Sequence, residues 1–388
     1  MPVYDIKKTF KYNFEHGPSI SSETLPFKII GQAKYPFWGK KLSSRLGIPA
    51  GLLLDSRWIR LYSQLGFDIL TYKTVRTRLQ TEHPYPNCLL VEATKPWLPG
   101  AIPDSVKTSK SYTPITKISM TNSLGVPDLQ SPEVWQPDIA ISKNYLQPGQ
   151  MLIVSVVGTA ENNHFDSFMQ DFVRAAALAA EAGAEVIELN FSCPNSPVEE
   201  GHIYEAPEFA AQITRAVRQQ VKDLPILIKI GYISEDNRLA RLLSAVSKDI
   251  SGIVGINSLK LRVVDQKGRQ ALPGADRSKS GISGYALKYL ARDFTRRLVA
   301  LREKEHYDFK IFAVGGILTP QDFQDFLDLG ADAALSCTGA MWDPALALKY
   351  HLHYSFPALN DPPKKKKAIM KTEFSSNIEH VLKVNNLL

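Results

Sequence analysis

The sequence predicts an α/β protein built as a single (β/α)8 TIM barrel. Eight short apolar runs recur along the 388 residues, and most of them are followed by a stretch with helical periodicity. Parallel strands are buried on both faces, so they read as nearly continuous apolar runs rather than as alternating ones. The eight predicted strands cover residues 48–52, 67–73, 152–158, 185–190, 226–230, 252–257, 310–316 and 333–337.

Amphipathic segments between these runs predict the helices. After Asp166, apolar residues recur at Phe168, Phe172, Val173 and Ala176, a stripe that would cover one face of a sheet. The same periodicity predicts further helices at residues 206–221, 237–247, 285–303 and 320–329. Strands that alternate with helices in this way are typical of βα units that close into a barrel.

Three segments fall outside the barrel, which we place at residues 47–355. They are an N-terminal extension at 1–46, an insertion at 78–117 after the second strand, and a basic C-terminal tail at 356–388. The insertion contains several prolines and is longer than an ordinary connection. Because it lies between the second strand and a polar loop, we expect it to shape the mouth of the barrel.

The net charge of +7 is concentrated at the two ends of the chain. The first 45 residues hold eight Lys and Arg against three Asp and Glu, and the residues from 356 onward hold six Lys against three acids. The middle of the chain is nearly neutral, so we expect no groove for nucleic acid. The lysine run at 364–367 is interpreted as a solvated tail.

Composition also argues against a membrane or metal protein. No apolar run reaches the roughly 18 residues of a spanning helix, and no secretory signal is readable, so we expect no membrane span and a cytoplasmic location. The cysteines Cys88, Cys193 and Cys337 are too few and too scattered for a disulfide framework or a metal cluster. We therefore predict no metal site.

Polar residues follow several of the predicted strands where those strands end. In a barrel of this kind, residues at the carboxyl ends of the strands carry the chemistry. A lone Asn after a strand is most often a turn former, and a lone Lys there often extends to solvent. Several carboxamides at one rim, however, suit a flat ring with alternating N–H and C=O groups, such as a pyrimidine. The residues concerned are Lys73, Asn122, Asn190, Asn195, Lys229, Asn257 and Ser258.

Cys193 stands in NFSCPNSP, just after the fourth predicted strand. A lone cysteine is most often a small buried hydrophobe. A thiol whose anion is favoured by its surroundings can instead act as a base near neutral pH. No histidine lies locally to form a Cys–His pair, so proton abstraction is the better interpretation.

Glycine-rich loops follow the last two strands, in AVGGIL and SCTGA, and SGISG lies at 280–284. The loops after the seventh and eighth strands commonly form the phosphate site of this fold. Glycine there would leave room for an anion to approach the backbone. These loops predict a ligand that carries a phosphate.

Taken together, the motifs resemble the dihydroorotate dehydrogenases, flavin enzymes of pyrimidine synthesis. The resemblance covers residues 47–346. It is carried by NFSCPN, NSLGVP, TYKT, ILIKIG, GINS, AVGG and CTGA. The resemblance implies an oxidoreductase that converts dihydroorotate to orotate in de novo UMP biosynthesis.

The resemblance also implies a role for each matching residue. FMN would be held by Ala50, Gly51, Lys73, Lys229, Gly281, Gly315, Gly316, Cys337 and Thr338. The substrate ring and its carboxylate would contact Asn122, Leu124, Gly125, Asn190, Asn195, Asn257 and Ser258. Cys193 would remove a proton while hydride passes to FMN, with Lys73 as the second catalytic residue.

A cysteine at position 193 resembles the class 1 enzymes, which use a soluble electron acceptor. The acceptor itself is not identified by the sequence, and a homodimer is compatible with it. Some positions depart from the family pattern: no glycine follows Pro197 until Gly201, and Ser280 and Cys337 stand where glycine is common.

Three other interpretations remain open. A dihydropyrimidine dehydrogenase-like enzyme would reduce uracil-type rings, although Asn195 stands where such enzymes tend to have histidine. A Schiff-base aldolase would also use a strand-end lysine and a phosphate site. A flavin-binding scaffold without activity is the third, but Cys193 and Lys73 are both present.

Overall fold

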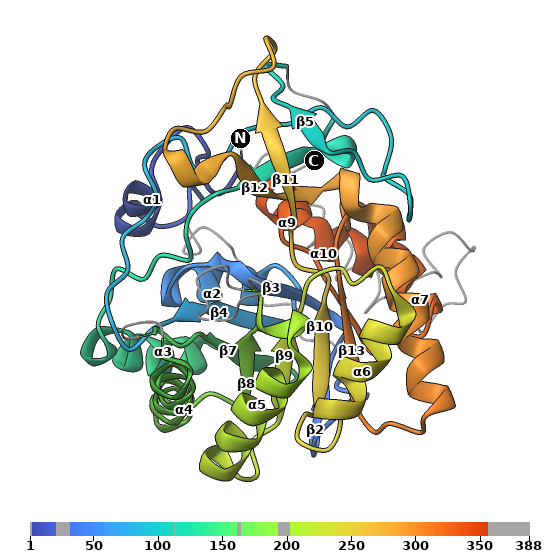
Figure 1. Ribbon diagram of the computed structural model, residues 1–388. Coiled ribbons are helices and arrows are strands. Elements are labelled where there is room, and N and C mark those ends of the chain that lie inside the picture. The colour runs from blue at the N-terminus through green and yellow to red at the C-terminus, as the bar shows by residue number, and fades with distance from the viewer. Residues whose placement is uncertain (1, 21–31, 112–113, 161–163, 193–201, 356–388) are drawn as a thin grey trace, which may run out of the picture.

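The computed structural model describes residues 2–20, 32–111, 114–160, 164–192 and 202–355. Its centre is a closed barrel of eight parallel strands in the order β10-β13-β14-β3-β4-β7-β8-β9 (Figure 1). The TIM-barrel prediction is confirmed, and each of the eight predicted strands is present. Their bounds are β3 (Leu46–Leu53), β4 (Ile69–Val75), β7 (Met151–Val156), β8 (Val186–Asn190), β9 (Ile226–Lys229), β10 (Gly252–Gly255), β13 (Lys310–Val314) and β14 (Ala333–Leu335).

Helices surround the barrel and bury their apolar stripes against it. In α4 the predicted stripe is fully buried at Phe168, Phe172 and Ala176. α8 begins with a capping box in which Thr319 and Asp322 each bond the other's backbone N–H. The longer helices are α2 (Ser56–Gln64), α3 (Pro132–Tyr145), α4 (Phe165–Glu181), α5 (Pro207–Val221), α6 (Asp236–Val246), α7 (Lys288–Lys304) and α8 (Pro320–Asp328).

Shorter helical segments complete the chain. They are α1 (Phe10–His16), α9 (Thr338–Trp342), α10 (Leu346–Tyr350), 3-10 turns at Ile115–Lys117, Ile203–Glu205, Ala275–Arg277 and Tyr285–Leu287, and a π-helical turn at His351–Ser355. Within the described ranges, no helix combines the length and the apolar character needed to cross a membrane.

A second sheet lies over the carboxyl ends of the barrel strands, at the top of Figure 1. It contains β5 (Ser105–Lys107), β11 (Leu259–Val264), β12 (Lys279–Gly284) and β6 (Ser119–Asn122), in that order. The predicted insertion at 78–117 supplies only β5. Residues 259–284, which the sequence analysis did not separate from the barrel, supply the two central strands. Two segments that are far apart in the sequence, the excursions at 78–122 and 259–284, therefore build one cover for the mouth.

The residues before the barrel reach both of its ends. The hairpin of β1 (Tyr35–Phe37) and β2 (Lys40–Leu42) packs Phe37 and Leu42 into the apolar cluster inside the barrel. α1 lies near the opposite end, where the Phe10 ring sits 5.1 Å from the ammonium group of Lys73. The N-terminal extension thus closes the bottom and contributes to the mouth.

Candidate functional site

The inside of the barrel changes from apolar to polar along its strands. Ile69, Ile153, Val186 and Leu227 belong to the apolar cluster near the hairpin. Successive side chains of a strand alternate between its faces, so the residues two positions further on also point inward. Those residues are Thr71, Ser155, Glu188 and Lys229, and two positions beyond them lie Lys73 and Asn190. Three residues of the predicted polar set, Lys73, Asn190 and Lys229, therefore line the inner side of the mouth.

Lys229 contacts another predicted cofactor residue, Ala50. Its Nζ donates a hydrogen bond of 3.0 Å to the carbonyl of Ala50, and the side chain is 5% exposed. Glu188 lies in the same interior and is fully buried. Burial raises the pKa of Glu188, and the charge of Lys229 and a hydrogen bond from Ser155 partly oppose that rise. The mouth thus holds a buried cation that donates a hydrogen bond to a neutral carbonyl.

Gly51 and Cys337 lie side by side at the ends of β3 and β14. Gly51 has a φ of +141°, in the region that favours glycine. The nearest atom to a Cβ placed there would be Cys337 Sγ, at 3.8 Å. Burial raises the pKa of Cys337, and the charge of Lys229 opposes the rise. The structure brings Ala50, Gly51, Lys229 and Cys337 together, and it leaves space beside the backbone of Gly51.

A second group of predicted residues meets beneath the covering sheet. Asn122 of β6 pairs directly with Gly281 of β12. A Cβ on Gly281 would lie 2.2 Å from Ser258 Oγ, so this position requires glycine because of Ser258. The Oδ1 of Asn257 accepts a hydrogen bond of 2.9 Å from the backbone N–H of Ser258. Four predicted residues from three segments are therefore neighbours.

Asn190 and Lys73 are both buried and held in place. The Nδ2 of Asn190 donates to Thr74 Oγ1 at 3.2 Å, and its Oδ1 accepts from the N–H of Ser192 at 3.3 Å. Lys73 donates from Nζ to the carbonyl of Pro127 at 3.1 Å. Residue 127 directly follows the NSLGV segment, so Lys73 ties the second barrel strand to that loop.

The NSLG turn is braced by a histidine that the sequence analysis missed. The backbone N–H of His83 donates a hydrogen bond of 3.0 Å to the backbone carbonyl of Leu124. Gly125 has a φ of +85°, and a Cβ there would lie 2.8 Å from the His83 ring. His83 belongs to the predicted insertion at 78–117, so this insertion contacts the NSLG turn. Only its place at the start of HPYP, a proline-rich segment, marks it in the sequence.

The glycines after β13 have a packing role. A Cβ on Gly315 would lie 2.7 Å from the Ala291 Cβ, and one on Gly316 would lie 2.5 Å from the Lys288 Cα. Both contacts are with residues of α7, so these glycines allow the helix to lie close to the end of the strand. Thr338 donates from Oγ1 to Ser283 Oγ at 3.1 Å, which joins the last barrel loop to β12. A phosphate site here stays a prediction.

Two predicted residues, Cys193 and Asn195, lie outside the described residues, so the structure does not place them. Around the sites that are described, no three His, Cys, Asp or Glu side chains gather closely enough to hold a metal ion.

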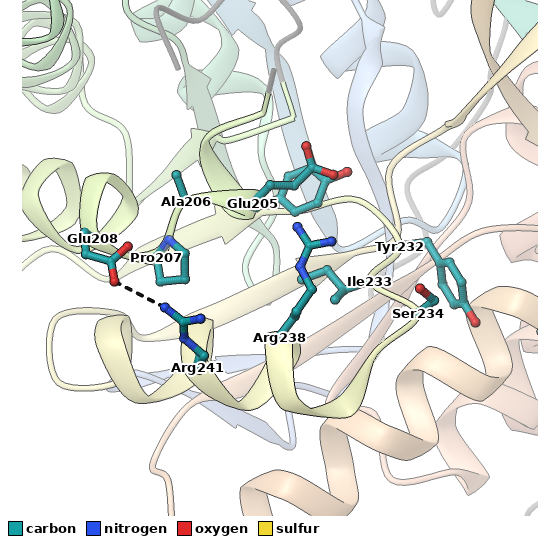
Figure 2. Close-up of a pocket in the computed structure, with 10 residues that line it drawn as sticks. Glu205, Ala206, Pro207, Glu208, Tyr232, Ile233, Ser234, Arg238 and Arg241 are labelled. Carbon is teal, nitrogen blue, oxygen red and sulfur yellow. Dashed lines mark ion pairs between the residues drawn. The ribbon is translucent and has the colours of Figure 1, made fainter. Parts of the chain in front are cut away.

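A hollow of about 270 Å³ lies apart from the predicted residues, between the start of α5 and the loop that leads from β9 to α6 (Figure 2). Arg241 pairs with Glu208 across it at 3.6 Å, and both side chains are mostly exposed. Tyr204 and Tyr232 form part of its wall. None of the predicted site residues lines this hollow, so we do not assign the function to it.

Comparison with known proteins identifies the family. Residues 112–349 match the family model described as dihydroorotate dehydrogenase. The dihydroorotate dehydrogenase of Dictyostelium discoideum is 35% identical over 364 residues, which are 90% of this chain and 96% of that protein. The chain belongs to the dihydroorotate dehydrogenase family. The prediction of an oxidoreductase of this family is confirmed.

Other relatives match shorter parts of the chain. A subunit of the NAD-dependent dihydropyrimidine dehydrogenase of Escherichia coli K12, PreA, is 34% identical over 200 residues, half of this chain and 46% of that protein. The catalytic subunit of dihydroorotate dehydrogenase B of Shouchella clausii is 29% identical over 59% of this chain and 69% of its own length.

A solved structure supports the fold. The crystal structure of DHODH from Eimeria tenella in complex with ferulenol superposes with a TM-score of 0.65 over 88% of this chain and 93% of that chain. The two sequences are 13% identical, so this match supports the barrel alone.

Proposed function

We propose that this protein oxidises dihydroorotate to orotate in pyrimidine biosynthesis, with FMN as its cofactor. The observation that supports the proposal most is that Asn190, Lys229 and Asn257 end or follow three neighbouring barrel strands, β8, β9 and β10, while Asn122 pairs with Gly281 beside Ser258. A set of amides around a buried cation suits a flat, polar heterocycle better than an aldehyde or a phosphosugar.

The residues at the mouth fit FMN. Lys229 is a buried cation, and Gly51 leaves the backbone beside it uncovered apart from Cys337. A flat ring next to Gly51 would lie within reach of the Lys229 ammonium, which stabilises negative charge on it. Ala50, Lys73, Gly281, Gly315, Gly316, Cys337 and Thr338 complete the set that we assign to FMN. When bound, FMN accepts the hydride and passes the electrons to an acceptor.

The protein residues divide the remaining work. The amides Asn122, Asn190, Asn195 and Asn257, with Ser258, hold the edge of the substrate ring. The backbone at Leu124 and Gly125 holds its carboxylate. Cys193 takes the proton from the carbon next to the ring carbonyl, while the hydride leaves from the adjacent carbon, so that a C=C bond forms. Lys73 lies close to both ligands and supports their negative charge.

Cys193 as the base makes this a class 1-like enzyme. Such an enzyme would pass its electrons to a soluble acceptor, which we leave unidentified, and would work in the cytoplasm. A homodimer is compatible with the proposal.

The second candidate is reduction of uracil-type rings, which the similarity to the E. coli PreA subunit favours. Purified flavin-loaded protein can be mixed anaerobically with dihydroorotate or with dihydrouracil, and the loss of the flavin absorbance followed. Our proposal predicts rapid bleaching by dihydroorotate and little by dihydrouracil. The reverse order would favour the second candidate. A colourless protein that borohydride inactivates with its substrate would favour an aldolase.

A further inference from the structure

Arg277 is a buried arginine in the 3-10 turn that leads into β12. Its side chain reaches toward both excursions that cover the mouth. All five of its N–H groups find acceptors: Nε donates to Ser123 Oγ at 3.1 Å, and the remaining four donate to the carbonyls of Pro84, Pro86, Ser123 and Pro273. Every one of these acceptors is electrically neutral.

None of the carboxylates whose side chains the structure describes balances the charge of the guanidinium. No such carboxylate forms an ion pair with Arg277 within 4.0 Å, and Cys88 favours the protonated guanidinium only as a thiolate. Burial raises the pKa of Cys88 to about 12, so this thiol is neutral at pH 7. Burial and the charge of Arg277 both lower the pKa of His83, so this ring is neutral as well.

A buried cation without a counter-charge is destabilising, because the charge loses its hydration and no opposite charge replaces that stabilisation. Such a group is retained most easily where a ligand brings the missing charge. The position of Arg277 indicates which ligand that is. Ser123, which it binds through both the hydroxyl and the carbonyl, directly precedes Leu124 and Gly125.

We propose that Arg277 is the counter-charge for the substrate carboxylate and the residue that positions the 123–125 turn, so that it selects pyrimidines with a carboxylate over neutral ones. This inference rests on the proposed function. Arg277 acts without touching the substrate, since all of its N–H groups are already used. Its charge stabilises the anion held by the backbone of the turn, and its hydrogen bonds fix that backbone.

The test compares orotate with orotamide, its neutral carboxamide of similar shape. Binding of each to the oxidised, flavin-loaded protein can be measured from the shift of the flavin absorbance. The wild-type protein is expected to bind orotate at least about tenfold more tightly than orotamide. In Arg277→Gln, which loses both the charge and most of the hydrogen bonds, both dissociation constants rise, and that for orotate rises at least about tenfold more than that for orotamide.

Arg277→Lys separates charge from geometry. It keeps the charge but loses most of the five hydrogen bonds, so it is expected to bind both ligands more weakly and still prefer orotate. The matched control is Arg302→Gln, because Arg302 pairs with Asp332 away from the mouth. It should leave both dissociation constants unchanged.

Three results would overturn the inference: equal weakening of both ligands by Arg277→Gln, an orotate preference that this variant retains, or a wild-type ratio near one. The last result needs no variant, so it applies even if Arg277→Gln does not fold. A wild-type protein that binds neither ligand and is not reduced by dihydroorotate would instead refute the proposed function.

Discussion

The two ends of the barrel are built by the same strands and differ in chemistry. At the bottom, Phe312 is fully buried and packs against the rings of Phe37 and Trp38, at centroid distances of 5.8 and 6.0 Å. At the mouth, the inward positions are occupied by charged and amide side chains such as Lys229 and Asn190. A strand therefore contributes to stability near its start and to ligand binding near its end.

The difference between the ends follows from what closes each of them. The β1–β2 hairpin covers the bottom with apolar side chains, so burial there adds directly to the free energy of unfolding. The mouth is covered by the second sheet, and the polar groups beside this sheet form hydrogen bonds within the protein. We expect substitutions at the bottom to change stability and substitutions at the mouth to change binding.

The largest effect is expected at the bottom, for Phe312→Ala. Removing a fully buried ring that packs on Phe37 and Trp38 should lower the free energy of unfolding by about 3 to 5 kcal/mol, as measured by urea denaturation. Phe312→Leu keeps most of the volume and should cost less than about 1.5 kcal/mol. Flavin binding by the Leu variant should match that of the wild type. If Phe312→Ala cost less than Phe312→Leu, the bottom would not be the stabilising end.

A pH effect is expected at Asp68, which links the starts of β3, β4 and β7 through backbone hydrogen bonds. Burial raises its pKa to about 6, partly opposed by hydrogen bonds from Ser44 and Gln150. The folded protein therefore binds more protons than the unfolded chain between about pH 4 and 6, and stability falls as the pH rises through this window.

Replacing Asp68 by Asn removes this ionisation. Between pH 4 and pH 7, the free energy of unfolding of the variant should fall by up to about 3 kcal/mol less than that of the wild type, because burial raises the pKa of Asp68 to about 6. Urea denaturation at pH 4 and pH 7 measures the change. The exposed Asp104→Asn should behave as wild type. If the stability of Asp68→Asn fell with pH as much as that of the wild type, the pH dependence would not come from Asp68.

The mouth is tested by Lys229→Met. This change removes the buried cation next to Ala50, and the affinity for FMN should fall at least tenfold, or about 1.4 kcal/mol, in a fluorescence titration of the apo-protein. Lys310→Met replaces a lysine at the other end of the barrel, where it pairs with Asp332 at 3.1 Å, and should leave the affinity unchanged. Equal losses in both variants would remove the distinction between the ends.

The barrel could be predicted from the sequence because its strands are apolar on both faces. The inward lysines and asparagines could be predicted for the same reason, since each one ends such a run. α2 and α3 were missed: α3 has Pro137 inside it, and α2 carries Arg57 and Arg60 among its buried apolar residues.

The cover of the mouth could not be predicted, and neither could the residues that depend on it. β5 and β6 have three and four residues, too short to form a pattern, and β5 pairs with a strand more than 150 residues later in the chain. His83 and Arg277 lie on these excursions. Their distance from the NSLG turn is set by sheet pairing and cannot be read from local sequence.

In the proposed function, Cys193 is the base that takes the proton from dihydroorotate. The most direct measurement is the anaerobic rate at which dihydroorotate bleaches the flavin in Cys193→Ala, compared with the wild type. We predict a variant that still binds flavin and orotate but is reduced at least about a hundredfold more slowly. Reduction at the wild-type rate would exclude Cys193 as the base.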